Sequence, residues 1–440
     1  MINKQNDKHS SPEAEMTFSG LGIAPTLLDV ILKAGFKTPT SIQYKAIAPA
    51  IEGKDIIGIA QTGTGKTLAF GIPLIQEILK LGRPKGSPYG LIILPTRELA
   101  IQVDETIRKI GRSFGIKTAV LIGGSSMYNQ VCYLRNNPHI VIGTPGRIND
   151  HIEQKTLKLN DNKVLVLDEA DRMFDMGFAP QIKRILQVLP RNRQTMLFSA
   201  TMPDDIVRIA SQYMKLPVRI EIARPGTTAK NVEQELYVVK REQKLPLLKK
   251  LLEDYKGSVL VFIRVKHNAR KICDNLRAIG VSSAEIHSNR SLAQRREALE
   301  GFKIGKYRVL VATDIASRGI DVKNIELVIN YDLPENAEDY VHRIGRTGRA
   351  GMSGKAISFA LTDQGSMVRD IERLTRIYLP ISNLPDIAAH MSKVIGVPEN
   401  FDKDSHPQNR NKSSQFGRRI NRFGGNNRNR DRNRSRNRNR

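Results

Sequence analysis

A glycine-rich loop is the first feature of this sequence with the chemistry to bind a ligand. Residues 60–67 read AQTGTGKT, after an apolar run and before a helical pattern. Glycines here allow backbone N–H groups to close around phosphate oxygens, and the helix N-terminus adds a positive dipole. The pattern predicts nucleotide contacts from Ala60, Gln61, Thr62, Gly63, Thr64, Gly65, Lys66 and Thr67, with Lys66 on the β- or γ-phosphate and the Thr67 hydroxyl on Mg²⁺. The alternative is a glycine-rich turn without a ligand, because Ala60 stands where the strict pattern has glycine.

An acidic pair ends another apolar run. Asp168 and Glu169 follow VLVL at 164–167. Charges that end a buried strand need a partner, and Mg²⁺ on a nucleotide phosphate would supply one. We therefore expect Asp168 to be the metal-side carboxylate and Glu169 to orient or deprotonate an attacking water. For either acid alone, the alternative is an ordinary helix N-cap.

A basic segment in the second half reads HRIGRTGR at 342–349. Arg343, Arg346 and Arg349 recur at i, i+3 and i+6, a spacing that places them on one face of a helix. Phosphoryl transfer needs cations for the charge of the transferring group. We expect Arg346 and Arg349 to be arginine fingers; a solvated basic face is the alternative.

The elements that position these groups are predicted by apolar runs without alternation, which are typical of parallel strands covered on both faces. Two consecutive blocks of such runs predict two doubly wound α/β domains with a cleft between them, and ligands at the carboxyl ends of the strands. The predicted strands are 55–60, 90–95, 118–124, 139–145, 163–171 and 194–201, then 235–240, 258–263, 283–287, 307–314, 326–331 and 355–360. Helical patterns between them include 97–110 and 179–189, and a polar segment at 216–231 separates the blocks.

The charge composition of the chain indicates what kind of molecule it binds. The chain has 70 Lys and Arg against 44 Asp and Glu, a formal net charge of +26, which indicates a polyanionic partner. Residues 401–440 hold 13 of these cations and 3 Asp, hence 13 − 3 = +10, with Phe416 and Phe423 among them. This tail is expected to be disordered and to bind nucleic acid, although a purely solubilising role is the alternative. The two cysteines exclude a disulfide framework, and the apolar runs are too short to span a membrane.

The motifs together resemble those of the DEAD-box ATP-dependent RNA helicases over about residues 16–378, in wording closest to the bacterial RhlE-like branch. The namesake tetrapeptide is Asp168-Glu169-Ala170-Asp171, and GFKTPTSIQ at 35–43 resembles the adenine-reading Q motif. The resemblance implies two RecA-like domains, ATP and Mg²⁺ as ligands, and Gln43 hydrogen-bonded to adenine. Phe18 or Phe36, with Thr38, would complete the adenine pocket.

Further roles are implied by the same resemblance. The expected RNA contacts are Arg97, Gly124, Thr144, Arg147 and Thr313; the coupling residues are Asp171, Ser199, Thr201 and His342; and Asp321 contacts the ribose. His342 is expected to bond to Asp171 on domain closure. The sequence departs from the family pattern at Ile263, Val265, Ser288 and Leu292, all in the RNA-facing part of the second domain. No comparable change affects the nucleotide residues, so an active enzyme is expected.

The expected organisation is a disordered N-terminus at 1–15, a first RecA-like domain at 16–215, a linker at 216–230, a second domain at 231–379 and a basic disordered tail at 380–440. The expected function is ATP-dependent unwinding of short RNA duplexes, or remodelling of RNA–protein complexes, in the cytoplasm and without membrane binding. Two alternatives stay open: a DNA-acting helicase of this fold, and an RNA clamp or chaperone dominated by its tail. The oligomeric state is open as well.

Overall fold

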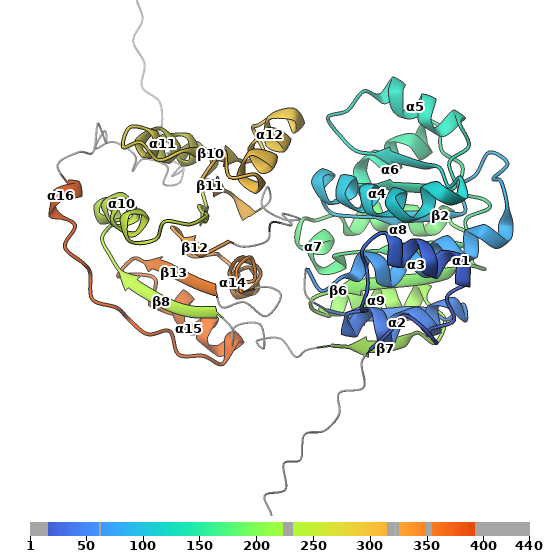
Figure 1. The fold of residues 1–440 in the computed structure, drawn as a ribbon, viewed down its shortest axis with the longest axis horizontal. Helices are drawn as coiled ribbons and strands as arrows, with labels where there is room; N and C mark the ends of the chain where they lie inside the picture. Colours follow the sequence, from blue (N-terminus) through green and yellow to red (C-terminus); the bar gives the residue numbers. More distant parts are fainter. Residues whose placement is uncertain are drawn as a thin grey trace, which may run out of the picture. The chain divides into compact units, whose positions relative to one another are not determined.

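Two parallel α/β sheets form the described part of the chain, which confirms the predicted fold class (Figure 1). The computed structural model describes residues 16–60, 63–222, 232–314, 322, 325–348 and 354–391. The predicted N-terminal segment at 1–15, the linker residues 223–230 and the tail from residue 392 lie outside these ranges. Within them, no helix is long and apolar enough to cross a membrane.

The first sheet has seven parallel strands in the order β3-β4-β2-β5-β6-β1-β7. Its strands are β1 (Ile56–Ile59), β2 (Gly90–Ile93), β3 (Thr118–Leu121), β4 (Ile140–Gly143), β5 (Val164–Leu167), β6 (Gln194–Ser199) and β7 (Val218–Glu221). The helices are α1 (Pro25–Lys33), α2 (Ser41–Ile51), α3 (Lys66–Leu81), α4 (Arg97–Gly111), η1 (Arg112–Phe114), α5 (Met127–Arg135), α6 (Pro145–Glu153), α7 (Ala170–Asp175), α8 (Ala179–Val188) and α9 (Asp204–Tyr213).

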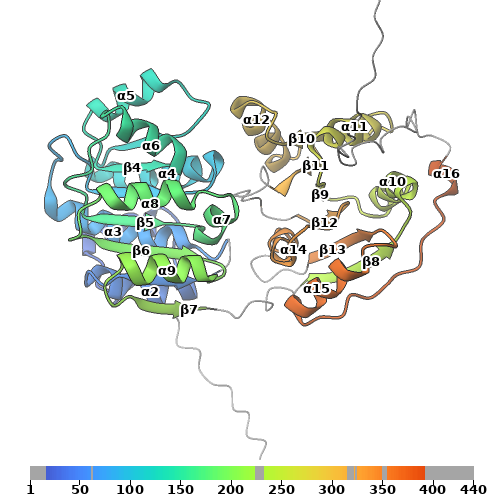
Figure 2. The same ribbon diagram turned by 180° about the vertical axis from the view of Figure 1, so that it is seen from behind.

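Helices cover both faces of this sheet, which is why its strands are apolar on both sides. Alternate residues of β5 enter two separate cores: Val164 and Val166 pack with α1 to α4, whereas Leu165 and Leu167 pack with α6 to α9. Figure 2 shows α8 and α9 in front of the strands, with α2 and α3 behind. Burial of both faces explains why unbroken apolar runs predicted six of these strands correctly, but not the edge strand β7.

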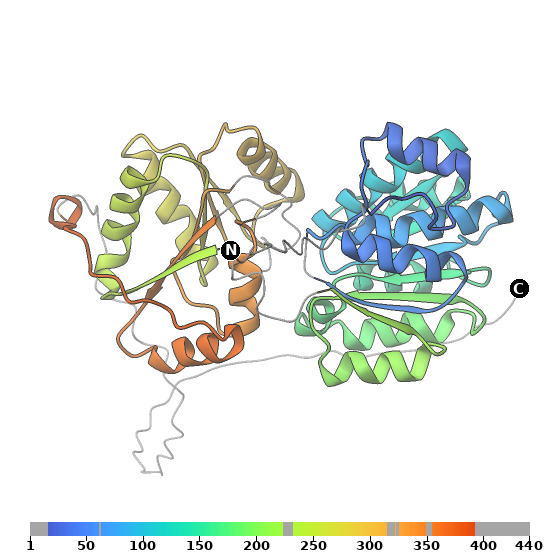
Figure 3. The same ribbon diagram turned by 60° about the horizontal axis from the view of Figure 1, so that its bottom comes forward.

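The second sheet has six parallel strands in the order β10-β11-β9-β12-β13-β8, again with helices on both faces (Figure 3). Its strands are β8 (Val232–Val238), β9 (Val259–Phe262), β10 (Ser283–Ile286), β11 (Val309–Ala312), β12 (Leu327–Asn330) and β13 (Gly354–Ala360). The helices are η3 (Arg241–Gln243), α10 (Lys244–Asp254), α11 (Lys266–Arg277), α12 (Leu292–Lys303), α14 (Ala337–Ile344), α15 (Gly365–Thr375) and α16 (Ala388–Met391).

Two predicted boundaries are wrong. The linker expected at 216–230 begins with β7, which pairs in parallel with β1 at the edge of the first sheet. Residues 380–391, expected to be the start of the disordered tail, pack on the second sheet instead. There the Leu236 N–H donates to the Pro380 carbonyl at 2.9 Å, the Ser382 N–H donates to the Leu236 carbonyl at 2.9 Å, and Ile387 is buried.

The order of the first sheet makes β5, β6 and β1 consecutive neighbours. Because parallel strands end at the same edge, the loops that follow these three strands meet there. They carry the acidic tetrapeptide after β5, Ser199 at the end of β6 and the glycine-rich loop after β1.

The buried carboxylate of Asp55 fixes the opposite end of β1. Its Oδ1 accepts from the Thr195 N–H at 2.7 Å, and its Oδ2 accepts from the Lys215 N–H at 2.6 Å. We expect Asp55→Ala to lower the free energy of unfolding of the first domain by about 2 kcal/mol or more, because one buried and one partly buried N–H group lose their acceptor. Urea denaturation measures this loss. Asp161→Ala, at an exposed position, is the control, and an equal effect of both changes would contradict the prediction.

Candidate functional site

Lys66 and Asp168 lie side by side at the carboxyl ends of β1 and β5. Lys66 is the first residue of α3, after Gly65, whose φ of 89° belongs to the left-handed region. The Lys66 Nζ lies 3.8 Å from the Asp168 Oδ1 and donates to the Ala60 carbonyl at 3.2 Å. Both side chains are buried, so the structure places the predicted phosphate-binding lysine against the predicted metal-side acid.

The acidic pair is almost fully removed from water. Asp168 is 3% exposed and Glu169 is 2% exposed. Burial raises the pKa of Asp168 to about 6; the Lys66 cation opposes this rise, and the Glu169 and Asp171 charges add to it. A cation bound at this edge would restore the ionised form, because it compensates for the lost water.

Glu169 is held in an unusual conformation with an unsatisfied side chain. It stands at the N-cap of α7 with a φ of 52°, and its side chain makes no capping bond, so the ordinary N-cap interpretation does not apply to it. Neither carboxylate oxygen has a hydrogen-bond partner among the described residues, although the Arg172 Nε lies 3.6 Å from Oε2. Backbone strain and an unsatisfied buried acid are features that cluster at functional sites.

Asp171 joins the acidic tetrapeptide to the end of β6. Its Oδ2 accepts from the Ala200 N–H at 3.0 Å, from the Thr201 N–H at 2.9 Å and from the Thr201 hydroxyl at 3.2 Å. Its own N–H donates to the Ser199 hydroxyl at 3.1 Å. The predicted coupling residues of the first domain therefore form one hydrogen-bonded unit.

Gln43 contacts the glycine-rich loop itself. Its Oε1 accepts from the Thr40 N–H at 3.0 Å, and its Nε2 donates to the Gly65 carbonyl at 2.9 Å. The Thr40 hydroxyl donates to the Thr64 carbonyl at 2.7 Å. Thr40 was not predicted as a site residue, although the T-x-x-Q spacing is a capping-box signal that identifies it. A Cβ on Gly65 would collide with the Gln43 amide, so this contact requires glycine there.

The remaining adenine candidates differ in accessibility. Phe18 packs in the core of the first domain, whereas Thr38 is exposed and Phe36 is half-buried with the Lys109 Nζ 5.2 Å from its ring centroid. Thr67 is half-buried in the first turn of α3, and Gly63 is exposed before it. Gln61, Thr62 and Asp321 lie outside the described residues.

Two arginines converge at the carboxyl ends of β2, β3 and β4. Arg97 begins α4, and its guanidinium packs on Gly123 and Gly124, where a side chain would collide with it. The Arg147 Nη1 donates to the Ser125 carbonyl at 3.1 Å. Burial, and then the charge of Arg147, lower the pKa of Arg97. An anion between the two guanidinium groups would relieve their repulsion.

Thr144 stands at the start of the nine-residue helix α6, at the same edge. Its hydroxyl makes no capping bond, and the first N–H groups of a helix attract anions. The predicted RNA contacts of the first domain therefore lie together. Thr313, the predicted contact of the second domain, is half-buried directly after β11.

The prediction of one helical face for the three arginines is wrong. Helix α14 ends at Ile344, so Arg346 lies beyond it, and Arg349 lies outside the described residues. Arg343 is 1% exposed; its Nε and Nη2 donate to Asp314 at 2.6 and 2.7 Å, and its guanidinium lies 5.1 Å from the Phe262 ring centroid. Arg343 therefore anchors the second domain. Arg346 is buried, and His342 is half-buried on α14.

The donor set at the acidic edge is suited to Mg²⁺. No group of three or more His, Cys, Asp or Glu side chains suitable for a metal occurs among the described residues. Mg²⁺ is usually held by one or two carboxylates together with substrate phosphates rather than by an all-protein cage. Asp168, the Thr67 hydroxyl and a nucleotide phosphate fit this pattern.

Comparisons with known proteins agree with this geometry. Residues 40–209 match the model of the DEAD/DEAH box helicase family, and residues 243–351 match the helicase conserved C-terminal domain. The chain is 45% identical to the ATP-dependent RNA helicase DbpA of Bacillus subtilis, over 81% of this chain and 74% of that protein. It is 44% identical to the DEAD-box ATP-dependent RNA helicase CshA of Bacillus cereus, over 82% and 68%.

Solved structures give the same result. A structure of S. cerevisiae Dbp5 bound to RNA and ADP BeF3 matches with a TM-score of 0.75 and 30% identity, over 86% of this chain and 98% of that one. A structure of Mss116p bound to ssRNA and AMP-PNP matches with a TM-score of 0.78 and 25% identity, over 89% and 83%.

The raised pKa of Asp168 predicts that removal of this charge stabilises the ligand-free protein. The pKa is about 3.9 in the unfolded chain and about 6 in the folded one, so folding is disfavoured as pH rises from 4 to 6 and stays disfavoured above. We expect Asp168→Asn to raise the free energy of unfolding by about 1–3 kcal/mol at pH 8 and by about half as much at pH 5. Thermal denaturation without nucleotide at both pH values measures this difference. An equal gain at pH 5 and pH 8 would disprove the electrostatic origin.

Proposed function

Because this chain belongs to the DEAD-box ATP-dependent RNA helicases, we propose that its described site couples ATP hydrolysis to the local separation of short RNA duplexes. The observation that carries the proposal is the Glu169 carboxylate, which is buried and has no hydrogen-bond partner among the described residues. It directly follows Asp168, which is paired with Lys66. A side chain in this state is poised for a ligand or a water molecule. The same cycle would serve the remodelling of RNA–protein complexes.

In the nucleotide site, each residue has a distinct task. Lys66 neutralises the β- and γ-phosphates, and Glu169 orients the attacking water and accepts its proton. Thr67 and Asp168 would hold Mg²⁺, which when bound neutralises charge on the phosphate oxygens. Gln43 reads the adenine edge by exchanging its bonds to Gly65 and Thr40 for bonds to the base.

Coupling runs through Asp171 and the residues at the end of β6. A shift of the acidic tetrapeptide on nucleotide binding would move Ser199 and Thr201, which share hydrogen bonds with Asp171. On domain closure, Arg346 and Arg349 would reach the γ-phosphate, Asp321 the ribose, and His342 would bond to Asp171. ATP and RNA then bind cooperatively, because each makes contacts that only the closed state provides.

RNA is proposed to lie on Arg97, Gly124, Thr144 and Arg147 of the first domain and on Thr313 of the second. Arginines and a helix N-terminus bind phosphates without reading sequence, whereas contacts to the 2′-hydroxyl favour RNA over DNA. The departures at Val265, Ser288 and Leu292 would modify the contacts of the second domain.

Two finer assignments complete the proposal. We place the chain in the RhlE-like branch on the wording of its motifs, and a tree of helicase cores that groups it with another branch would overturn this placement. We also propose a cytoplasmic location, for which cell fractionation is the test.

Glu169→Gln is the decisive variant. It keeps the shape of the side chain but removes its basicity, so we expect RNA-stimulated ATP hydrolysis to fall by more than about 100-fold. Strand separation should be lost, while RNA still binds in the presence of ATP. A coupled phosphate-release assay and a duplex displacement assay measure the two effects.

Glu105→Gln, an exposed acid on α4, is the matched control and should behave as the unmodified protein. Undiminished strand separation by Glu169→Gln would favour the clamp or chaperone alternative instead. Stimulation of the unmodified protein by DNA as strong as by RNA of equal length would favour the DNA-acting alternative.

The basic tail is expected to make its own, salt-dependent contribution to RNA binding. Deletion of residues 401–440 removes 13 cations and 3 acids, so RNA affinity should fall and depend less steeply on salt, while basal hydrolysis stays unchanged. Titrations at several salt concentrations measure the slope. A tail of the same composition in shuffled order is the control and should restore affinity; loss of basal hydrolysis on deletion would contradict an independent tether.

A further inference from the structure

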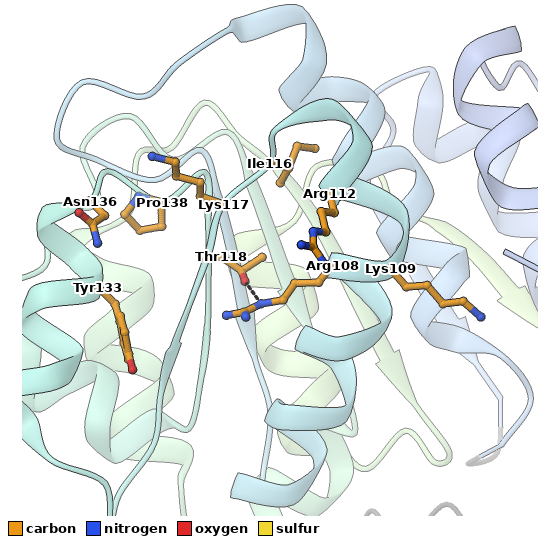
Figure 4. A pocket seen from close by; sticks show the side chains of 9 residues that line it. All are labelled: Arg108, Lys109, Arg112, Ile116, Lys117, Thr118, Tyr133, Asn136 and Pro138. Atoms are coloured by element: carbon orange, nitrogen blue, oxygen red, sulfur yellow. Dashed lines mark hydrogen bonds between the residues drawn. The ribbon is translucent and has the colours of Figure 1, made fainter. Parts of the chain in front are cut away.

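A basic groove crosses the first domain at the amino ends of β3 and β4. It contains a pocket of about 460 Å³ lined by Arg108, Arg112, Lys117, Tyr133 and Asn136, among others (Figure 4). A second pocket of about 430 Å³ shares Lys117 and Asn136 with the first. We call the two together the amino-edge groove.

This groove is separate from the nucleotide and RNA site described above. Lys117 directly precedes β3 and Asn136 precedes β4, and the two strands are parallel. The glycine-rich loop, the acidic tetrapeptide and Arg97 all follow strands of the same sheet. The two sets therefore lie at opposite edges, and none of the predicted site residues lines the groove.

The groove contains more positive charge than the described residues around it neutralise. Arg108 pairs with Asp104, with Nε 2.9 Å from Oδ2, and its Nε donates to the Thr118 hydroxyl at 2.9 Å. By contrast, the side chains of Arg112 and Lys117 have no hydrogen-bond or ion-pair partner in the structurally described part of the chain.

The position of Arg112 and Lys117 is not explained by a need for positive charge at the C-terminal ends of the helices. Helices α4 and α5 both end beside the groove, and cations in their last turns, Arg108 and Arg135, already complement the negative ends. Arg112, the C-cap of α4 and first residue of η1, and Lys117, which follows η1, add further positive charge. The charge of Lys117 reaches the neighbouring His139, whose pKa is lowered first by burial and then by Lys117 and Arg83.

An aromatic ring beside the cations identifies the class of ligand. Tyr133 is 52% exposed and lines the pocket with Arg112 and Lys117. Cations that attract phosphates, next to an exposed ring on which a base can stack, are typical of single-stranded nucleic-acid binding. An acidic peptide would use the cations but would not require the ring, and the pocket volume is suited to a unit of nucleotide size.

We propose that the amino-edge groove is a second RNA-binding site, in which Arg112 and Lys117 bind backbone phosphates and Tyr133 stacks on a base. The proposal rests on RNA as the substrate of the proposed function. RNA that extends beyond the catalytic edge would be retained there between hydrolysis cycles, because this contact does not depend on nucleotide.

Charge reversal in the full chain tests the proposal. In Arg112→Glu/Lys117→Glu, affinity for a long single-stranded RNA should fall about tenfold or more, and the salt slope should fall by about 1.4, at 0.7 for each lost phosphate contact. ATP hydrolysis stimulated by an oligonucleotide too short to reach both edges should stay unchanged. Lys158→Glu/Lys183→Glu, at exposed positions outside the groove, is the matched control.

Long-RNA affinity equal to that of the control pair would overturn the proposal and leave an acidic protein partner as the ligand of the groove. Absence of RNA stimulation in the unmodified protein would instead disprove the proposed function, so the two failures are distinguishable. If the double variant does not fold, Tyr133 gives an independent answer. Tyr133→Ala should weaken long-RNA binding, Tyr133→Phe should preserve it, and a photoreactive uridine in long RNA should crosslink to the segment around residue 133; no crosslink there would also overturn the proposal.

Discussion

The burial of two adjacent carboxylates at the end of one strand is the constraint on which the rest of the site depends. Asp168 and Glu169 lose their water on folding, and the described part of the chain compensates them only partly, through Lys66 and Arg172. A folded protein can keep such a loss of hydration free energy where a bound ligand compensates for it. Binding of a nucleotide and a metal ion at this edge would complete an electrostatic arrangement that the described residues leave incomplete.

The acids of the tetrapeptide differ in the number of hydrogen bonds that their side chains accept. Asp171 is fully engaged with Ser199, Ala200 and Thr201, whereas the Glu169 carboxylate has no hydrogen-bond partner among the described residues. A shift of Asp171 would break several hydrogen bonds at once, so in the proposed mechanism this acid transmits movement. Glu169 is the acid proposed for the chemistry. Under this proposal, one short motif contains both the reactive group and the contact that couples it to β6.

The sequence predicted the strands that are buried on both faces, because they appear as apolar runs. It missed β7 and residues 380–391, which show no such run. Strands such as β5 are apolar on both faces, so unbroken runs identify them. Strand β7 is an edge strand with Ile220 as its only fully buried residue, and its polar neighbours resemble a linker. At residues 380–391, backbone hydrogen bonds join Pro380 and Ser382 to Leu236, and these bonds leave no pattern in side chains. Ile387 is the one buried apolar residue among the described side chains of this segment, which is too little to distinguish it from a tail.

The predicted site residues also divide into those that the structure brings together and those that it does not. Motif spacing located Lys66, Asp168 and Asp171, because strand order brings their loops together. The prediction of a shared helical face for the arginines was wrong, because α14 ends at Ile344 and helical periodicity does not extend beyond the end of the helix.

Net charge alone does not distinguish the arginines that stabilise the fold from those that are free to bind a ligand. Arg343 is neutralised by Asp314 and Arg108 by Asp104, so both stabilise the fold. By contrast, burial and then the charge of Arg147 lower the pKa of Arg97, and a bound anion would offset both effects. The total of +26 indicates the class of partner, but the pairing of each cation indicates where that partner binds.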